Sequence, residues 1–207
     1  MNKTNIAVLV SGGGTNLQAI IDAQKNGIIV NGEIKIVVSD KRDAFALQRA
    51  KTANIKTAVV VKKECLDRAE FENKIISILS ENNIDLIVLA GFMCILSKDF
   101  TSRYANRIIN VHPSLIPSFC GEGFYGLKVH KAALEYGVKV TGATVHFVNE
   151  IPDGGAIIMQ KAVEIDKNDT PESLQKKVMQ QAEWIILPKA VELVSKQLLE
   201  KTIKDKN

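Results

Sequence analysis

Asn110 and His112 stand at the end of an apolar run, and prolines follow at positions 113 and 117. Proline cannot continue a sheet ladder or a helix, so a buried strand over residues 108–112 is predicted to end here. Two residues apart in an extended chain, the amide and the imidazole point to one side. A hydrogen-bond donor beside a titratable base suits acyl transfer, as oxyanion donor and proton carrier. The alternative interpretation is a turn-capping Asn and a structural His.

A glycine-rich turn over residues 11–16, SGGGTN, follows an apolar run and opens a helical pattern. Its glycines let backbone N–H groups converge, and a helix N-terminus adds partial positive charge, which together favour a bound phosphate. Walker-A spacing is absent, and Leu17 stands where a dinucleotide motif has its last glycine. The pattern therefore favours a monophosphate over ATP or NAD. The alternative is a tight turn capped by Thr15.

Asp153 lies in a turn, where an aspartate ordinarily bonds its own backbone. It gains a chemical role if the turn folds over His112, because a carboxylate would raise the pKa of the imidazole. His146 lies in an apolar strand pattern, where a core or supporting role is at least as well favoured as catalysis. His130 is expected on the surface, and the spacing of the histidines does not favour a metal site.

Glu183 and Arg68 receive no function from the residues alone. Glu183 stands in an apolar helical pattern, where a surface carboxylate needs no role. Arg68 is expected to form an exposed ion pair within residues 67–72.

The composition excludes several classes of function. Of 207 residues, 46% are hydrophobic and 24% charged, with a net charge of +4. Aromatic residues make up 5%, without the basic stripe of a nucleic-acid-binding protein, so an anionic small substrate is favoured. Three cysteines at positions 65, 94 and 120 lack C-x-x-C spacing and are expected as reduced thiols. Without a signal-peptide pattern or a membrane-length apolar run, the protein is expected in the cytoplasm.

The first half of the chain alternates short apolar runs with helical patterns. Strands are predicted over residues 6–10, 33–38, 57–61 and 84–89. Helices are predicted over residues 15–25, 43–53 and 67–80, the second capped by Asp43. This alternation predicts an α/β fold with a doubly wound, mostly parallel sheet. In such sheets ligands bind beyond the carboxyl ends of the strands.

The second half of the chain changes pattern. A glycine-rich loop at 118–126 leads to a helix over 127–136, followed by two strands at 139–148 and 156–163. Their short connection predicts an antiparallel pair. A final helix begins at Thr170, with a kink predicted near Pro188, and runs to about residue 199. Without a linker-like segment, residues 1–207 are expected to form one domain.

Five motifs together resemble the phosphoribosylglycinamide formyltransferase family. They are SGGGTN at 11–16, LAGFM at 89–93, NVHPSL at 110–115, TGATVH at 141–146 and DGG at 153–155. The resemblance runs from about residue 6 to about residue 188. It implies transfer of a formyl group from 10-formyltetrahydrofolate to the amine of glycinamide ribonucleotide. Direct attack is implied, with neither a metal nor a covalent enzyme intermediate.

The same resemblance implies roles for individual residues. His112 would be the general acid/base, Asn110 would stabilise the oxyanion, and Asp153 would keep His112 protonated through an ordered water. The ribonucleotide site would comprise Gly14, Thr15, Asn16 and Glu183, with Glu183 at the amine. The folate site would comprise Arg68, Met93, Cys94, Ile95, Leu96 and Asn110, with residues 149–153 beside the pterin. Phosphate binding thus falls to residues 1–100, and catalysis and most folate contacts to residues 101–207.

The chain departs from the family pattern in three places. Cys94 replaces a common basic residue, Trp184 replaces a common histidine, and the loop over 120–129 is longer than in some relatives. The rival enzyme is a formyltetrahydrofolate hydrolase, whose relatives carry an extra N-terminal domain. An initiator-tRNA formyltransferase would need a further C-terminal domain and a broad basic face. A non-catalytic nucleotide-binding regulatory module would tolerate replacement of His112. Small-molecule partners are expected, without nucleic acid or membrane, for a monomer or homodimer.

Overall fold

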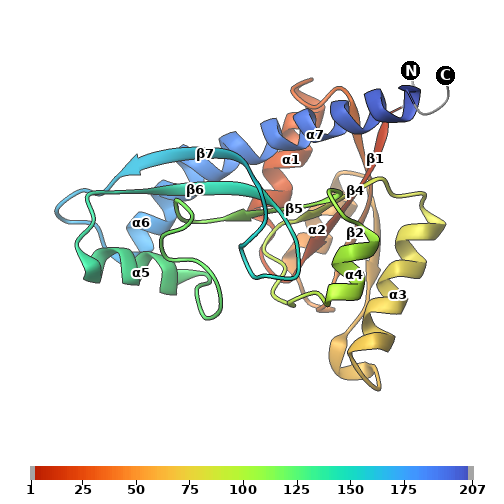
Figure 1. Ribbon diagram of the computed structural model, residues 1–207, viewed down its shortest axis with the longest axis horizontal. Coiled ribbons are helices and arrows are strands. Elements are labelled where there is room, and N and C mark those ends of the chain that lie inside the picture. The colour runs from red at the N-terminus through yellow and green to blue at the C-terminus, as the bar shows by residue number, and fades with distance from the viewer. Residues whose placement is uncertain (1–2, 205–207) are drawn as a thin grey trace.

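One seven-stranded sheet runs through the molecule in the order β3-β2-β1-β4-β5-β6-β7 (Figure 1). The computed structural model describes residues 3–204. The strands are β1 (Thr4–Val10), β2 (Gly32–Ser39), β3 (Lys56–Val59), β4 (Leu86–Leu89), β5 (Ile108–His112), β6 (Val140–Phe147) and β7 (Ile157–Glu164). Strands β1 to β5 pair in parallel, whereas β6 pairs antiparallel with both β5 and β7. The predicted α/β fold, mostly parallel with an antiparallel C-terminal pair, is confirmed.

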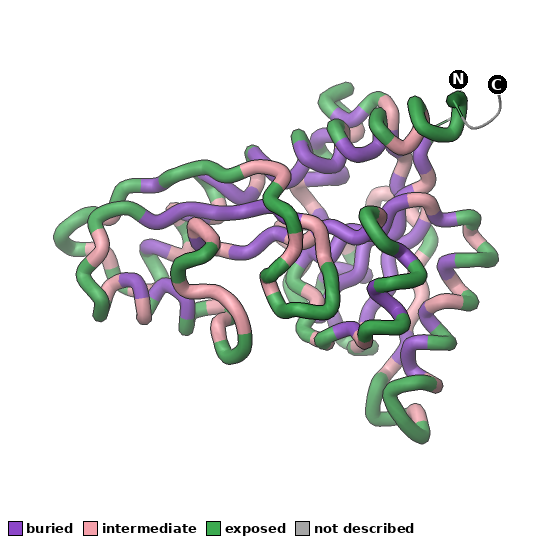
Figure 2. Tube along the Cα trace, viewed as in Figure 1, coloured by how far each residue is buried: buried purple, intermediate pink, exposed green. Residues whose placement is uncertain are grey.

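Helices cover both faces of this sheet. They are α1 (Thr15–Lys25), α2 (Phe45–Thr52), α3 (Arg68–Glu81), α4 (Lys98–Arg103), α5 (Leu127–Tyr136), α6 (Pro171–Val178) and α7 (Trp184–Lys204). Ile6 and Val8 of β1 belong to the core that α1 and α7 cover, whereas Ala7 and Leu9 belong to the core covered by α3. Because alternate strand residues fill opposite cores, β1, β4 and β5 are buried along almost their full length (Figure 2).

The carboxyl ends of β1, β4 and β5 lead into the segments that concern function. β1 is followed by the glycine loop, β4 by residues 90–97, and β5 by residues 113–126. β5 marks the change from parallel to antiparallel pairing, since Asn110 lies opposite Leu89 on one side and His146 on the other. The strand that carries Asn110 and His112 is therefore held from both sides.

The helices of the first half differ from the prediction in two ways. α2 is preceded by Ala44, with no side-chain cap, so the predicted cap at Asp43 is wrong. α4 was not predicted, because its six residues are too few to show a helical period. Its N-cap is Ser97, whose hydroxyl accepts a hydrogen bond from the N–H of Phe100.

The C-terminal helical segment breaks earlier than predicted. α6 passes into a π-helical turn over Met179–Glu183, and α7 then continues to Lys204. Pro188 lies within α7, which continues to Lys204, so the end predicted near residue 199 is wrong, whereas the kink near Pro188 stays a prediction. The π-helical turn ends just before Trp184. In a regular helix the carbonyl oxygen of Trp184 would accept from the N–H four residues later, but that residue is Pro188, which has no N–H.

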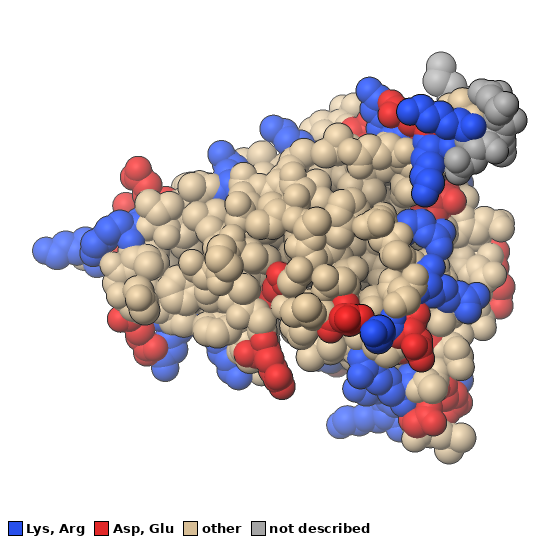
Figure 3. Space-filling model, viewed as in Figure 1, with Lys and Arg blue, Asp and Glu red and all other residues tan. Residues whose placement is uncertain are grey.

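Charged side chains are spread rather than gathered. On the face shown in Figure 3, Lys and Arg lie mostly around the rim, with Asp and Glu among them. Within residues 3–204, no helix combines the length and apolar character needed to cross a bilayer.

Candidate active site

Asn110 and His112 lie at the carboxyl end of β5, as predicted, and His112 is 4% exposed. Nε2 of His112 lies 2.9 Å from the carbonyl oxygen of Phe119. Because a carbonyl only accepts, Nε2 carries the proton of this bond. The other ring nitrogen, Nδ1, lies 3.4 Å from Oδ2 of Asp153. Both ring nitrogens therefore face protein acceptors. The turn that carries Asp153 folds over His112, which is the condition under which Asp153 was expected to have a chemical role.

Burial lowers the pKa of His112, and the opposing attractions of Asp153 and of the Phe119 carbonyl do not cancel it. His146 lowers the same pKa further. The predicted upward effect of Asp153 on the imidazole pKa is present, but the cost of burying the charge exceeds it, so the pKa of His112 is lowered overall.

Asp153 joins the catalytic candidates to the loop that follows β5. Its Oδ2 accepts a hydrogen bond of 2.9 Å from the N–H of Gly121. Burial alone would raise the pKa of Asp153, but His146, His112 and the Gly121 N–H together leave it lowered. The carboxylate therefore stays charged at neutral pH beside the two histidines.

His146 is the residue of this cluster to which the sequence assigned no definite role. Its Nδ1 lies 2.8 Å from the carbonyl oxygen of Phe147, so Nε2 is left as an acceptor when the ring is neutral. Nε2 lies 3.2 Å from Nδ2 of Asn110 and 3.5 Å from Oδ1 of Asp153. His146 thus orients the amide of Asn110. Only the register of β6 against β5 reveals this contact, and no local motif encodes that register.

His130, which the sequence placed on the surface, is buried in α5 with 1% exposure. Neither ring nitrogen has a hydrogen-bond partner among the described residues. Burial, and then the nearby His112, lower the pKa of His130 to about 4. The surface prediction is wrong because α5 turns this position into the interior, close enough to His112 for the two rings to influence each other.

The glycine loop has the form expected of an anion site. Gly14 is in the left-handed conformation, with φ 72°, immediately before α1. A Cβ added at Gly14 would lie 2.6 Å from Cβ of Ala46, whereas Gly13 faces open space. Only glycine satisfies both the conformation and the close approach of α2. Thr15 is the first helical residue and does not cap the helix, which disfavours the structural alternative for the loop.

Asn16 and Glu183 meet although they are far apart in the chain. Nδ2 of Asn16 donates a hydrogen bond of 2.7 Å to Oε2 of Glu183. Glu183 ends the π-helical turn and is 6% exposed, so its expected place on a helix surface is wrong. Burial raises the pKa of Glu183 to about 7, against the opposing effect of the Asn16 hydrogen bond. Such a carboxylate is suited to a ligand that brings a positive charge or an N–H donor.

The predicted folate residues form one neighbourhood around the segment after β4. Met93 and Ile95 are exposed, whereas Leu96 is buried. Nη2 of Arg68 donates to the carbonyl oxygen of Ile95 at 2.8 Å. Cys94 donates its S–H to Asp40, and burial, with Asp40, raises the pKa of this thiol to about 11.

The predicted site residues thus form three groups at one edge of the sheet. The first is the Asn110–His112–Asp153 cluster, the second is the glycine loop with Glu183, and the third is the segment over 93–96 with Arg68. The second and third groups are joined by the N–H of Met93, which donates to the Ser11 hydroxyl at 2.8 Å.

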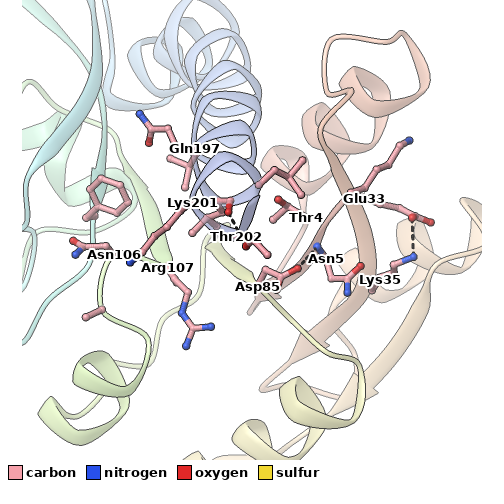
Figure 4. Close-up of a pocket in the computed structure, with 16 residues that line it drawn as sticks. Thr4, Asn5, Glu33, Lys35, Asp85, Asn106, Arg107, Gln197, Lys201 and Thr202 are labelled. Carbon is pink, nitrogen blue, oxygen red and sulfur yellow. Dashed lines mark hydrogen bonds and ion pairs between the residues drawn. The ribbon is translucent and has the colours of Figure 1, made fainter. Parts of the chain in front are cut away.

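A cavity lies at the other end of the strands, away from these three groups. This cavity of about 930 Å³ is lined by the amino-terminal ends of β1 and β2 and the last turns of α7 (Figure 4). Its lining includes Lys35, Asp85, Arg107 and Lys201, and none of the residues that the sequence assigned to a site.

Within residues 3–204, no group of three or more His, Cys, Asp or Glu side chains is arranged to hold a metal ion.

Comparison with known proteins gives consistent results. Residues 4–191 match the formyl transferase family. Phosphoribosylglycinamide formyltransferase of Haemophilus influenzae is 45% identical over 88% of this chain and 83% of its own. The trifunctional purine biosynthetic protein adenosine-3 of Gallus gallus is 45% identical over 94% of this chain, which spans only 19% of that longer protein.

Solved structures agree in fold. The crystal structure of glycinamide ribonucleotide transformylase 1 from Symbiobacterium toebii has a TM-score of 0.88 at 38% identity, covering 94% of this chain and 89% of that one. Phosphoribosylglycinamide formyltransferase from Coxiella burnetii, in complex with CHES, has a TM-score of 0.87 at 39% identity, covering 95% and 89%. With the family matched along most of its length, and with relatives this similar, the chain belongs to the formyl transferase family.

Proposed function

We propose that this protein transfers the formyl group of 10-formyltetrahydrofolate to the amine of glycinamide ribonucleotide, a step of purine biosynthesis. The observation that carries the proposal is the contact of Asp153 with His112, beside Asn110, at the end of β5 in a member of this family. Relatives named phosphoribosylglycinamide formyltransferase, similar over most of this chain, support the choice of substrates.

The proposed reaction is direct and balanced. The substrate amine attacks the formyl carbon, so that a C–N bond forms, and the bond from that carbon to N10 of the folate then breaks. His112, whose Nε2 donates to the Phe119 carbonyl, accepts at Nδ1 the proton that the amine loses. It returns this proton to N10, and tetrahydrofolate leaves. Asp153 stabilises the imidazolium that exists between the two transfers.

Asn110 has the position of an oxyanion donor. One of its amide N–H groups is directed to His146, which fixes the plane of the amide. The second N–H is available to the oxygen that becomes negative in the tetrahedral intermediate. A donor held in place before the reaction lowers the barrier more than one that must reorient.

Three further assignments complete the proposal. The substrate phosphate binds backbone N–H groups of the glycine loop at the N-terminus of α1. The side-chain amide of Asn16 is not used for the phosphate, because it already donates to Glu183. Glu183 receives the substrate amine, whose N–H donors suit a buried carboxylate. The folate lies along Met93 and Ile95, whose exposed apolar side chains suit its ring system, with Arg68 beside them and residues 149–153 bordering the pterin.

The test supplies both substrates to purified protein and follows tetrahydrofolate and the formylated product separately. We expect equal amounts of both from the wild type, and a loss of about a hundredfold or more in His112→Ala. Lys131→Ala, an exposed change on α5, is the control and should retain full activity. Tetrahydrofolate without formylated product would identify a hydrolase. Absence of both products would favour a nucleotide-binding module.

A further inference from the structure

Glu72 on α3 is a buried carboxylate that the proposed chemistry does not use. Its side chain is 8% exposed, whereas that of Glu70 on the same helix is 35% exposed. Glu72 is nevertheless fully engaged. It accepts hydrogen bonds from the backbone N–H of Ser97, at 2.7 Å, and from the Ser97 hydroxyl, and it pairs with Nε of Arg68 at 3.1 Å.

These bonds all lead to the segment between β4 and α4, which has no regular secondary structure. Ser97 is its last residue, and Glu72 fixes it there. Arg68, which Glu72 orients through Nε, uses Nη2 to hold the carbonyl oxygen of Ile95 at 2.8 Å. At the other end, the Ser11 hydroxyl holds the N–H of Met93. Glu72 therefore holds this segment directly at Ser97 and indirectly, through Arg68, at Ile95.

Helix capping alone does not account for Glu72. The Ser97 hydroxyl already caps α4 by accepting from the N–H of Phe100, at 3.1 Å. Burying a carboxylate costs free energy unless hydrogen-bond donors surround it. The use of a buried carboxylate at position 72 therefore points to a need for fixed geometry in the segment that it holds. The side chains that this geometry displays are Met93 and Ile95, which are 54% and 60% exposed.

We propose that Glu72 is a positioning residue for the folate subsite, holding the segment over 93–96 and the Arg68 guanidinium in the geometry that receives the formyl donor. The proposal rests on the proposed function, because it takes the donor to be a folate. In this role Glu72 acts through Ser97 and Arg68 rather than on the substrate itself. Its loss should therefore weaken folate binding and leave ribonucleotide binding and the proton transfer at His112 unchanged.

The first test is Glu72→Gln, which keeps the shape of the side chain and removes its charge. We expect KM for 10-formyltetrahydrofolate to rise about tenfold, with KM for glycinamide ribonucleotide and kcat within about twofold of the wild type. Glu81→Gln, at an exposed position at the end of the same helix, is the matched control and should change none of these values. An equal rise in both KM values, or an unchanged folate KM, would overturn the proposal.

A second test separates positioning from mere stability. Ser97→Ala removes one partner of Glu72, and the double variant should raise the folate KM no more than Glu72→Gln does alone, because both changes release the same segment. Additive effects would overturn the shared role. Thermal unfolding of each variant shows whether the fold is retained, and Glu72→Asp, which keeps the charge, should recover part of the folate affinity.

Direct binding of 5-formyltetrahydrofolate by calorimetry distinguishes failure of this inference from failure of the proposed function. If the wild type binds the folate without transferring a formyl group, only the proposed function fails, and the affinity of Glu72→Gln still decides the role of Glu72. A wild type that binds no folate would overturn both.

Discussion

The parallel and antiparallel parts of the sheet prepare their sites in different ways. The glycine loop after β1 and the segment after β4 present backbone N–H groups and apolar side chains, and side chains from elsewhere hold them in place. At the junction of β5 and β6, side chains themselves form the site, and each of them bonds another. Backbone suits the recognition of a phosphate, whereas proton transfer needs a group that titrates.

The largest expected loss of activity concerns the side-chain site at the junction of β5 and β6. Asn110→Ala removes the proposed oxyanion donor, so kcat should fall by roughly 10²–10³-fold. Asn73→Ala, an exposed change on α3, should leave kcat unchanged. Steady-state kinetics with both substrates measure the loss, and thermal unfolding shows that the fold remains. A variant that lost substrate affinity but kept kcat would remove the distinction drawn above.

Glu183 belongs to the C-terminal part but pairs with Asn16 of the N-terminal part, so its titration tests how the two are joined. Its pKa is raised from the usual 4.5 to about 7 by burial. The stability that comes from the protonated form is complete below pH 4.5 and is lost as pH rises through 7. The wild type should therefore lose roughly 2–3 kcal/mol of unfolding free energy between pH 5 and pH 8, relative to Glu183→Gln.

Urea unfolding of both proteins at the two pH values measures this difference. Glu200→Gln, an exposed change elsewhere on α7, serves as the comparison. Parallel pH profiles for wild type and Glu183→Gln would show that the buried carboxylate does not control stability.

The backbone part is tested by Gly14→Ala. The new Cβ would lie 2.6 Å from Cβ of Ala46 in a left-handed conformation, so we expect a loss of about 1–3 kcal/mol and a rise of about tenfold in KM for the ribonucleotide. Gly13→Ala is the matched control, since its Cβ meets nothing within 4 Å. Equal effects of both changes would mean that loop flexibility, rather than the approach of α2, sets binding.

The smallest effect is expected at Cys120. It lies in the loop after β5, and burial, with the charge of Asp153, raises the pKa of its thiol. A direct transfer needs no thiol, so Cys120→Ala should retain formyl transfer within about twofold. A large loss of kcat, or an acylated thiol trapped during turnover and detected by mass spectrometry, would contradict direct attack.

The sequence predicted those elements well whose information is local. Helices α1 and α5 begin and end at the predicted residues, since an apolar period with a preceding glycine identifies them. The antiparallel pairing of β6 and β7 followed from a connection too short for a helix. The short helix α4 and the π-helical turn have no period of their own and were missed.

The candidate site divides along the same line. Asn110 and His112 are neighbours on one strand, so their relation is visible in the sequence. The contacts of His146 depend on strand register, and the burial of His130 and Glu183 depends on how helices pack, neither of which one sequence segment specifies. The net lowering of the His112 pKa was missed for the same reason, because burial is a property of the assembled fold.

The hydroxyl of Ser11 accepts a hydrogen bond from the N–H of Met93. The backbone N–H of Ser11 donates to the carbonyl oxygen of Gly91 at 3.1 Å. The loop proposed for the phosphate and the segment proposed for the folate therefore share two hydrogen bonds. A ligand that shifts one of them changes the free energy of the other. Thermodynamic linkage makes such cooperativity reciprocal, so whatever factor the ribonucleotide imposes on folate affinity, the folate imposes on ribonucleotide affinity.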